Sequence, residues 1–149
     1  MADIVWSVDP RRDRLSDLLR RLRETAYRLE GDGIEVVFEA PGDLEAARIN
    51  IAPDRKRNLL LLFKEALHNI TRHAHARHVR IDLRLAAGRL HLRIADDGVG
   101  FDPHTSHSGL GLASMTRRAQ DLGGALTIES RPAAGTSLGL AIPLRARRA

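Results

Sequence analysis

The sequence contains no cysteine. A disulfide framework and a thiolate metal site are therefore excluded, and nothing favours an oxidising compartment. No apolar run approaches the roughly 20 residues that a membrane span needs, and the first residues lack the basic start and apolar stretch of a signal peptide. We therefore expect a soluble, cytoplasmic chain that makes no membrane contact itself, with a membrane anchor elsewhere in the parent protein left open.

Aromatic residues and lysine are also scarce. Phe, Trp and Tyr make up 3% of the 149 residues, so the net charge of +5 is carried mainly by arginines scattered over every segment. Binding of single-stranded nucleic acid needs a basic groove with stacking rings, and this composition does not supply the rings. We expect no nucleic-acid partner, and we interpret residues 145–149 as a solvated basic tail.

The remaining composition fits one domain with its own core. Helical spacing of apolar residues predicts helices at Asp13–Arg28, at about Asp54–His73 with Pro53 in the first turn, and at about Leu112–Leu122. Apolar and polar alternation predicts strands, at Ile34–Ala40, Ala47–Ile51, His78–Ala86, Leu90–Ile94, Ala125–Ser130 and Thr136–Leu144. Paired strands between helices favour an α/β (α+β) fold, a two-layer sandwich with a mixed, mostly antiparallel sheet and its helices on one face.

The long helix carries a line of polar side chains. Glu65, Asn69 and His73 are four residues apart and lie along one helix edge, next to an apolar arc that can pack on a core. Asn69 offers an uncharged oxygen suited to one Mg²⁺ ligand when phosphates and water provide the others. Glu65, one turn earlier, could orient or deprotonate an attacking group.

Two glycine-containing segments follow the helix. Asp96, at a strand end, offers an acceptor for an amino group, and Gly98 and Gly100 leave the backbone bare enough for a planar ring. Gly109 and Gly111 leave backbone amides open as the chain enters a helix, where N–H groups and the dipole favour anions. Each feature alone has an ordinary structural explanation as a turn, a linker or a solvated helix face. Their conjunction, in this order, predicts a nucleotide pocket.

Three motifs carry a family resemblance. EALHNITRHA, ADDGVGF and GLGLASM resemble the N, G1 and G2 boxes of the ATP-binding domain of two-component sensor histidine kinases, in the superfamily shared with gyrase, Hsp90 and MutL. The resemblance extends from about Ile34 to Leu144 and implies a Bergerat-type fold. The pattern GLxxMxxRAxxLGG is similar to the subfamily with a short dimerisation domain, typified by nitrate and membrane-fluidity sensors. The chain would then divide into a linker and N-terminal helix at 1–33, the ATPase domain at 34–144 and the tail at 145–149.

The resemblance also implies roles in binding Mg-ATP. Asn69 would ligate Mg²⁺, and Asp96 would accept a hydrogen bond from the adenine amino group. The other positions implied to contact or frame the nucleotide are Arg72 and His73 at the phosphates, Gly98 and Gly100 at the adenine wall, Gly109, Leu110, Gly111 and Leu112 at the lid, and Thr136 at the base through water. Glu65 matches the carboxylate that acts on water in the superfamily's ATP hydrolases and is the candidate catalytic residue.

Two features depart from the family pattern. The family commonly has Asn where this chain has Asp97, so that a second negative charge either approaches the phosphates, where magnesium could offset it, or points outward. No histidine here is followed by Asp or Glu, the pair that marks the phosphoacceptor helix. We interpret the crowded His68, His73, His75 and His78 as a solvated helix face.

The resulting hypothesis is the ATP-binding catalytic domain of a sensor histidine kinase. It would bind Mg-ATP and donate the γ-phosphoryl group to a histidine on a dimerisation domain absent from this chain, with a response regulator downstream and a homodimeric parent kinase. It would not autophosphorylate alone. Two alternatives are an anti-sigma-factor-type serine kinase of the same superfamily and a non-catalytic nucleotide-binding regulatory module.

Overall fold

The computed structural model describes residues 14–101 and 111–144. The helical elements are α2 (Leu15–Tyr27), η2 (Arg28–Asp32), α3 (Asp43–Ala46), α4 (Pro53–Asn69), η3 (Ile70–Ala74) and α5 (Leu112–Asp121). The strands are β1 (Glu35–Glu39), β2 (His78–Ala86), β3 (Arg89–Asp96), β4 (Ala125–Ser130) and β5 (Thr136–Pro143). No helix in the described part of the chain combines the length and the apolar character that crossing a membrane requires.

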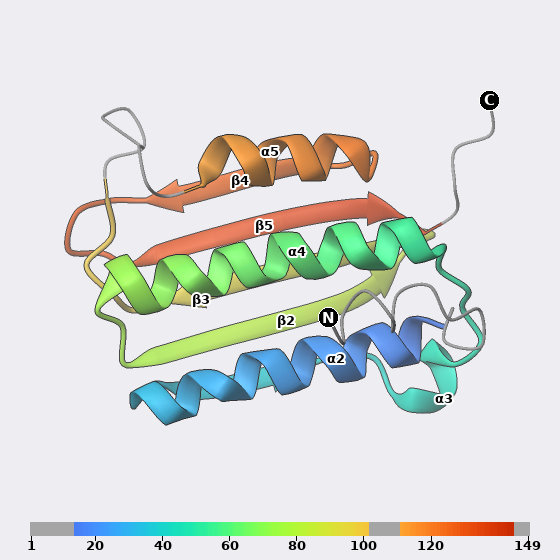
Figure 1. Cartoon of the computed structure of the whole chain (residues 1–149), viewed down its shortest axis with the longest axis horizontal. Helices are drawn as coiled ribbons and strands as arrows, with labels where there is room; N and C mark the ends of the chain where they lie inside the picture. The colour runs from blue at the N-terminus through green and yellow to red at the C-terminus, as the bar shows by residue number, and fades with distance from the viewer. Residues whose placement is uncertain (1–13, 102–110, 145–149) are drawn as a thin grey trace.

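The strands form one mixed sheet in the order β1-β2-β3-β5-β4. β1 runs parallel to β2, and the other neighbouring pairs are antiparallel. Helices α2, α4 and α5 lie side by side over the same face of this sheet (Figure 1). The predicted two-layer α+β sandwich, with a mostly antiparallel sheet and helices on one face, is confirmed.

The core fills the space between the two layers. Alternate residues of the central strands point inward, and the buried ones are Val79, Ile81 and Leu83 of β2, Leu90, Leu92 and Ile94 of β3, and Leu138, Leu140 and Ile142 of β5. Helix α4 lies over the middle of the sheet and buries Leu59, Leu62 and Phe63 completely. Leu15, Leu18 and Leu22 of α2 are also fully buried, so the N-terminal helix contributes to the same core. This packing places the polar edge of α4 above the ends of β3 and β5.

The strand predicted at Ala47–Ile51 is wrong. The residues before it form the short helix α3, and within the segment only Asn50 makes an isolated bridge, to Arg14. Its alternating pattern has another cause, because Ile49 and Ile51 pack toward the core from a turn and a connection that form no strand in the described part of the chain. The pattern therefore indicated the burial of Ile51 and the partial burial of Ile49, but Ala47 is exposed and the predicted strand pairing is wrong.

The end of the long helix also differs from a regular α-helix. The prediction ended it at His73, whereas the α-helical part ends at Asn69 and a π-helical turn, η3, continues to Ala74. His75 then takes a left-handed conformation with φ of 52°. Single π-turns inside or at the end of α-helices occur frequently at functional sites. Here the turn carries Arg72 and His73.

Candidate functional site

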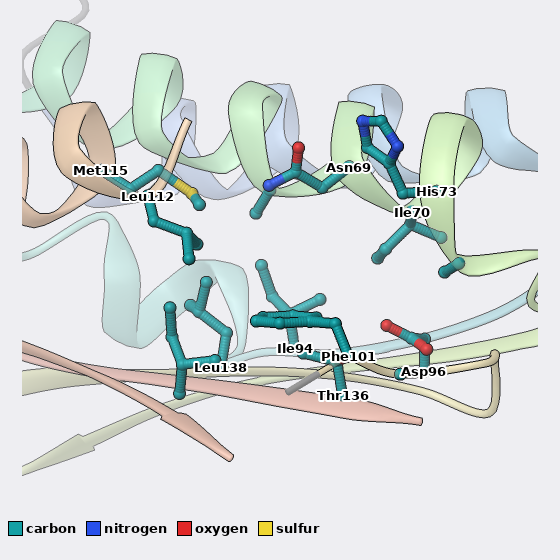
Figure 2. A pocket seen from close by; sticks show the side chains of 14 residues that line it. Asn69, Ile70, His73, Ile94, Asp96, Phe101, Leu112, Met115, Thr136 and Leu138 are labelled. Carbon is teal, nitrogen blue, oxygen red and sulfur yellow. The ribbon is translucent and has the colours of Figure 1, made fainter. Parts of the chain in front are cut away.

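A cavity of about 150 Å³ lies between α4 with η3 on one side and β3 with β5 on the other. Its lining is mainly apolar, with a few polar side chains at one end. The lining residues are Ala66, Asn69, Ile70, His73, Ala74, Ile94, Asp96, Gly100, Phe101, Leu112, Met115, Ile128, Thr136 and Leu138. Figure 2 shows Asn69 and His73 on the helical side, opposite Asp96 and Thr136 on the sheet side. An apolar cavity with a few converging polar groups is typical of a small-molecule site.

Asp96 ends β3 at the polar end of the cavity. Its Oδ1 accepts a hydrogen bond of 2.8 Å from the backbone N–H of Gly98. Burial raises the pKa of the Asp96 carboxyl, while hydrogen bonds from the N–H groups of Gly98 and Thr136 oppose the rise. A carboxyl group held in one orientation beside an apolar cavity can accept a hydrogen bond from a ligand amino group.

Asn69 and His73 lie across the cavity from Asp96, one helical turn apart (Figure 2). Both line the cavity, as the spacing predicted. Arg72 is exposed and does not line the cavity, so it can reach a bound phosphate only from outside. The structure therefore brings together two of the three polar residues expected at this end of the helix.

Glu65 lies one turn before Asn69, away from this cavity. Its carboxylate approaches Gly111, because a side-chain carbon added at Gly111 would overlap Oε1 of Glu65. Gly111 precedes α5 in a left-handed conformation with φ of 66°, which favours glycine. Glu65 therefore lies at the N-terminal end of α5, where the helix dipole favours negative groups.

Gly98 and Gly100 are required by contacts within the chain. A side-chain carbon at Gly98 would overlap the carbonyl of Ala74, and one at Gly100 would overlap the carbonyl of Arg131. The backbone N–H of Val99 donates a hydrogen bond of 2.7 Å to the same Ala74 carbonyl. The two glycines thus let the turn after β3 pack tightly against η3 and the β4–β5 turn. Gly100 lines the cavity and Gly98 does not.

Ser130 is a polar residue of the site that lies outside the three motifs. It is 8% exposed, and its Oγ lies 2.9 Å from the N–H of Phe101 and 2.8 Å from Oγ1 of Thr136. Phe101 and Thr136 both line the cavity. The available signal in the sequence was the position of this polar residue at the end of β4, a strand of otherwise alternating residues.

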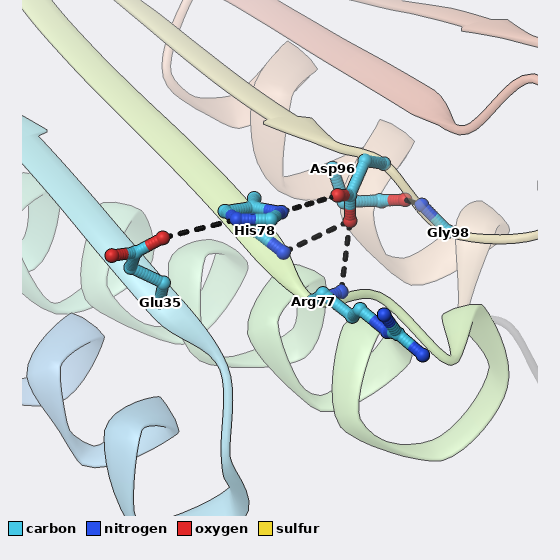
Figure 3. Close-up of polar contacts among 6 residues, drawn as sticks. Glu35, Arg77, His78, Asp96 and Gly98 are labelled. Atoms are coloured by element: carbon cyan, nitrogen blue, oxygen red, sulfur yellow. Dashed lines mark hydrogen bonds and ion pairs between the residues drawn. The ribbon is translucent and has the colours of Figure 1, made fainter.

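Asp97 points away from the cavity. Its carboxylate accepts hydrogen bonds from the N–H groups of Arg77 and His78, at 2.8 and 2.9 Å, and lies 2.6 Å from Nδ1 of the His78 ring. The other ring nitrogen of His78 lies 3.0 Å from Glu35, so that the imidazole bridges two carboxylates (Figure 3). Of the two possibilities for Asp97, the outward one is confirmed. The bonds from His78 and Arg77 lower the pKa of Asp97 to about 2, and the bond to Asp97 raises the pKa of His78.

Two expected site residues, Gly109 and Leu110, lie outside the described residues. Leu112 is described, and it lines the cavity at the end opposite Asp96 together with Met115 (Figure 2). Within residues 14–101 and 111–144, no three His, Cys, Asp or Glu side chains come together in a way that could hold a metal ion.

The family model of histidine kinase-, DNA gyrase B- and HSP90-like ATPases matches residues 54–146. This span contains α4, β3, α5 and β5, the elements that surround the cavity. The chain belongs to this ATPase family. The match supports an ATP-binding domain, and the elements around the cavity lie within the matched span.

Individual relatives place the chain within the family. It is 35% identical over 125 residues to the sensor histidine kinase MctS of Rhizobium johnstonii, covering 80% of this chain and 26% of that protein. It is 28% identical over 133 residues to the histidine-protein kinase/phosphatase DegS of Bacillus subtilis, covering 85% of this chain and 34% of that protein. The chain thus spans about a quarter to a third of the length of these relatives. It corresponds to the ATP-binding catalytic domain of a sensor histidine kinase.

Solved structures give the same fold. The blue-light activated histidine kinase EL346 of Erythrobacter litoralis superposes with a TM-score of 0.70 at 22% identity, over 88% of this chain and 42% of that one. The likeness shows that the two chains share this fold.

Proposed function

We propose that this chain binds Mg-ATP and donates the γ-phosphoryl group to a histidine on a dimerisation domain of its parent kinase. The observation that carries the proposal is the cavity, in which the Asp96 carboxylate and the Thr136 hydroxyl lie at the polar end of an apolar space. Adenine has an apolar face and an exocyclic amino group, so it matches both parts of this lining. Asp96 would accept from the amino group, and Thr136 would bind the base through water.

The phosphates would extend from the base toward the helical side of the cavity. Asn69 and His73 line that side. Arg72, also on η3, is exposed to solvent beside them. The N-terminal end of α5, with Gly111 and the preceding Gly109 and Leu110, would supply backbone amides to the phosphates. Gly100 and Leu112 would shape the walls, and Gly98 would act indirectly, through the position of the turn that follows Asp96.

Asn69 is the residue of this chain suited to hold Mg²⁺. Its side-chain amide lines the cavity on the helical side, and phosphate oxygens and water commonly complete the coordination of this ion. A magnesium ion bound there would neutralise phosphate charge during transfer. The donor set fits, because one neutral oxygen from the protein is enough when the nucleotide supplies the others.

The remaining contribution of the chain is positioning. Phosphoryl transfer depends mostly on alignment and charge stabilisation, so holding the base and the phosphates brings the γ-phosphoryl group in line with an incoming imidazole. Glu65, at the N-terminal end of α5, is the candidate to orient the attacking group. The acceptor histidine, a second copy of the parent kinase and a response regulator would be the partners, and the domain would act in the cytoplasm.

The alternatives predict different products. A purified chain given labelled Mg-ATP should not label itself, but it should label a histidine-bearing dimerisation fragment of the parent kinase. That label should be lost in acid, because phosphohistidine is acid-labile. Acid-stable label on a serine antagonist would instead favour the serine kinase. ATP binding without transfer to either acceptor would favour a regulatory module.

A matched control uses the same acceptor fragment. The variant Asp96→Ala should abolish labelling because the base loses its acceptor, whereas Thr127→Ala, on the opposite face of the sheet, should label at the wild-type rate. Labelling that survives Asp96→Ala would contradict the assignment of the cavity to ATP.

A further inference from the structure

The hydroxyl of Ser130 joins three groups around the polar end of the cavity. Its Oγ lies 2.9 Å from the N–H of Phe101, 2.8 Å from Oγ1 of Thr136 and 3.2 Å from the carbonyl oxygen of Gly135. Phe101 belongs to the segment after β3, whereas Gly135 directly precedes β5 and Thr136 begins it. Ser130 is buried, so these contacts are made largely without competition from solvent.

The number of hydrogens available limits the directions that these bonds can take together. A serine hydroxyl has one hydrogen to donate and two lone pairs to accept. The N–H of Phe101 can only donate, and the buried carbonyl of Gly135 can only accept. If Ser130 donates to Gly135, Thr136 must donate its own hydrogen to Ser130. All four groups are then satisfied, as buried polar groups generally are.

This arrangement determines what Thr136 offers to a ligand. With its hydrogen directed at Ser130, Oγ1 of Thr136 presents lone pairs to the cavity. The Asp96 carboxylate, at the same end (Figure 2), is also an acceptor. Thr136 would reach the base through a water molecule, and a water that gives one hydrogen to each of these two acceptors can only accept a hydrogen from the ligand. The site then matches a ligand edge that carries an amino group and opposes one that carries a carbonyl oxygen.

We propose that Ser130 is a positioning residue that holds the Thr136 hydroxyl as an acceptor and thereby favours 6-aminopurine over 6-oxopurine nucleotides. The proposal rests on the ATP-binding function and deepens it. Ser130 does not line the cavity, so it acts through Thr136 and through the backbone of Phe101.

The test compares the dissociation constants of ADP and inosine diphosphate, measured by calorimetry. The variant Ser130→Ala should lower the preference for ADP by about 3- to 10-fold, the range expected for one neutral hydrogen bond. Thr136→Val should lower the preference as well. Because Ser130 acts through Thr136, the double variant should show little further loss. The control Ser137→Ala, a serine on the same strand as Thr136 but on the outer sheet face, should keep the wild-type preference.

Three results would overturn this role. They are an unchanged preference in Ser130→Ala, equal weakening of both nucleotides, and losses in the double variant that simply add. Ser130→Cys keeps nearly the same volume with a weaker hydrogen-bonding group, so it gives the same test if the alanine variant does not fold. Failure of the wild-type chain to bind ADP would be a separate result, since it would remove the proposed function itself.

Discussion

At the residue scale, the two glycines of the ADDGVGF motif are required by backbone contacts within the chain itself. From the sequence, Gly98 and Gly100 are expected to leave bare backbone beside a planar ring. The structure shows that each glycine lets two backbone segments approach, at Ala74 and at Arg131. Their effect on nucleotide binding is therefore indirect, through the position of the turn that follows Asp96.

This packing predicts a large stability effect for a small change. Gly98→Ala should lower the free energy of unfolding by about 2 kcal/mol, because the added methyl group would overlap a backbone carbonyl that cannot move aside cheaply. Gly31→Ala is the matched control, since nothing lies within 4 Å of a carbon added there and the residue is exposed. Urea denaturation measures both. Equal stability of the two variants would show that the turn relaxes freely.

At the element scale, the regular helices and strands were predictable from the sequence, whereas the connections between them were not. The sequence predicted β2 and β4 with their observed bounds, because alternation and turn residues are local signals. It missed α3 and placed a strand at Ala47–Ile51, since pairing depends on which strand lies alongside. The π-turn η3 and the hydrogen bonds that Ser130 makes were not predicted either, because both arise from contacts between distant segments.

The bridge of His78 between β1 and the end of β3 predicts a pH dependence. The pKa of His78 is raised in the folded chain, so its contribution to stability is present below the ordinary pKa of 6.5 and is lost as the pH rises through the folded value. The pKa of Asp97 is lowered from 3.8 to about 2, so its contribution is present above 3.8 and is lost as the pH falls through about 2. Together the two groups stabilise the fold most between about pH 4 and 6.5.

The measurement is an NMR titration of the His78 ring. In Asp97→Asn, which restores the residue common in the family, the pKa of His78 should fall relative to the wild-type chain because the charged partner is gone. Glu35→Gln should lower it less, since the bond to Asp97 is the larger cause of the shift. A ring that titrates at the same pH in all three proteins would show that the bridge is absent in solution.

At the scale of the whole molecule, the chain spans about a quarter to a third of the length of the kinases that it matches. The family assignment, the sheet order and the cavity agree on an ATP-binding catalytic domain. Most of the candidate site was predictable, because Asn69, His73, Asp96 and Thr136 belong to motifs whose residues meet around one cavity. The division into segments 1–33, 34–144 and 145–149 stays a prediction. Helix α2 nevertheless packs into the same core as the ATPase elements.

That packing predicts a consequence for shortened chains. Removal of residues 1–33 deletes α2, whose Leu15, Leu18 and Leu22 are fully buried. The shortened chain should expose the apolar surface beneath the helix and unfold at a lower temperature, because each leucine loses about 1.5–3 kcal/mol of burial. Removal of residues 145–149 should change little. An unchanged unfolding temperature in calorimetric scans of the first deletion would show that α2 contributes nothing to the core.

The most direct test of the central claim is a calorimetric titration of the chain with ATP, with and without Mg²⁺. The wild-type chain should bind ATP under both conditions and more tightly with magnesium. Asp96→Ala should abolish binding in both, whereas Asn69→Ala should keep the magnesium-free binding and lose mainly the gain that magnesium brings. No binding by the wild-type chain, or equal losses of both components in the two variants, would contradict the account.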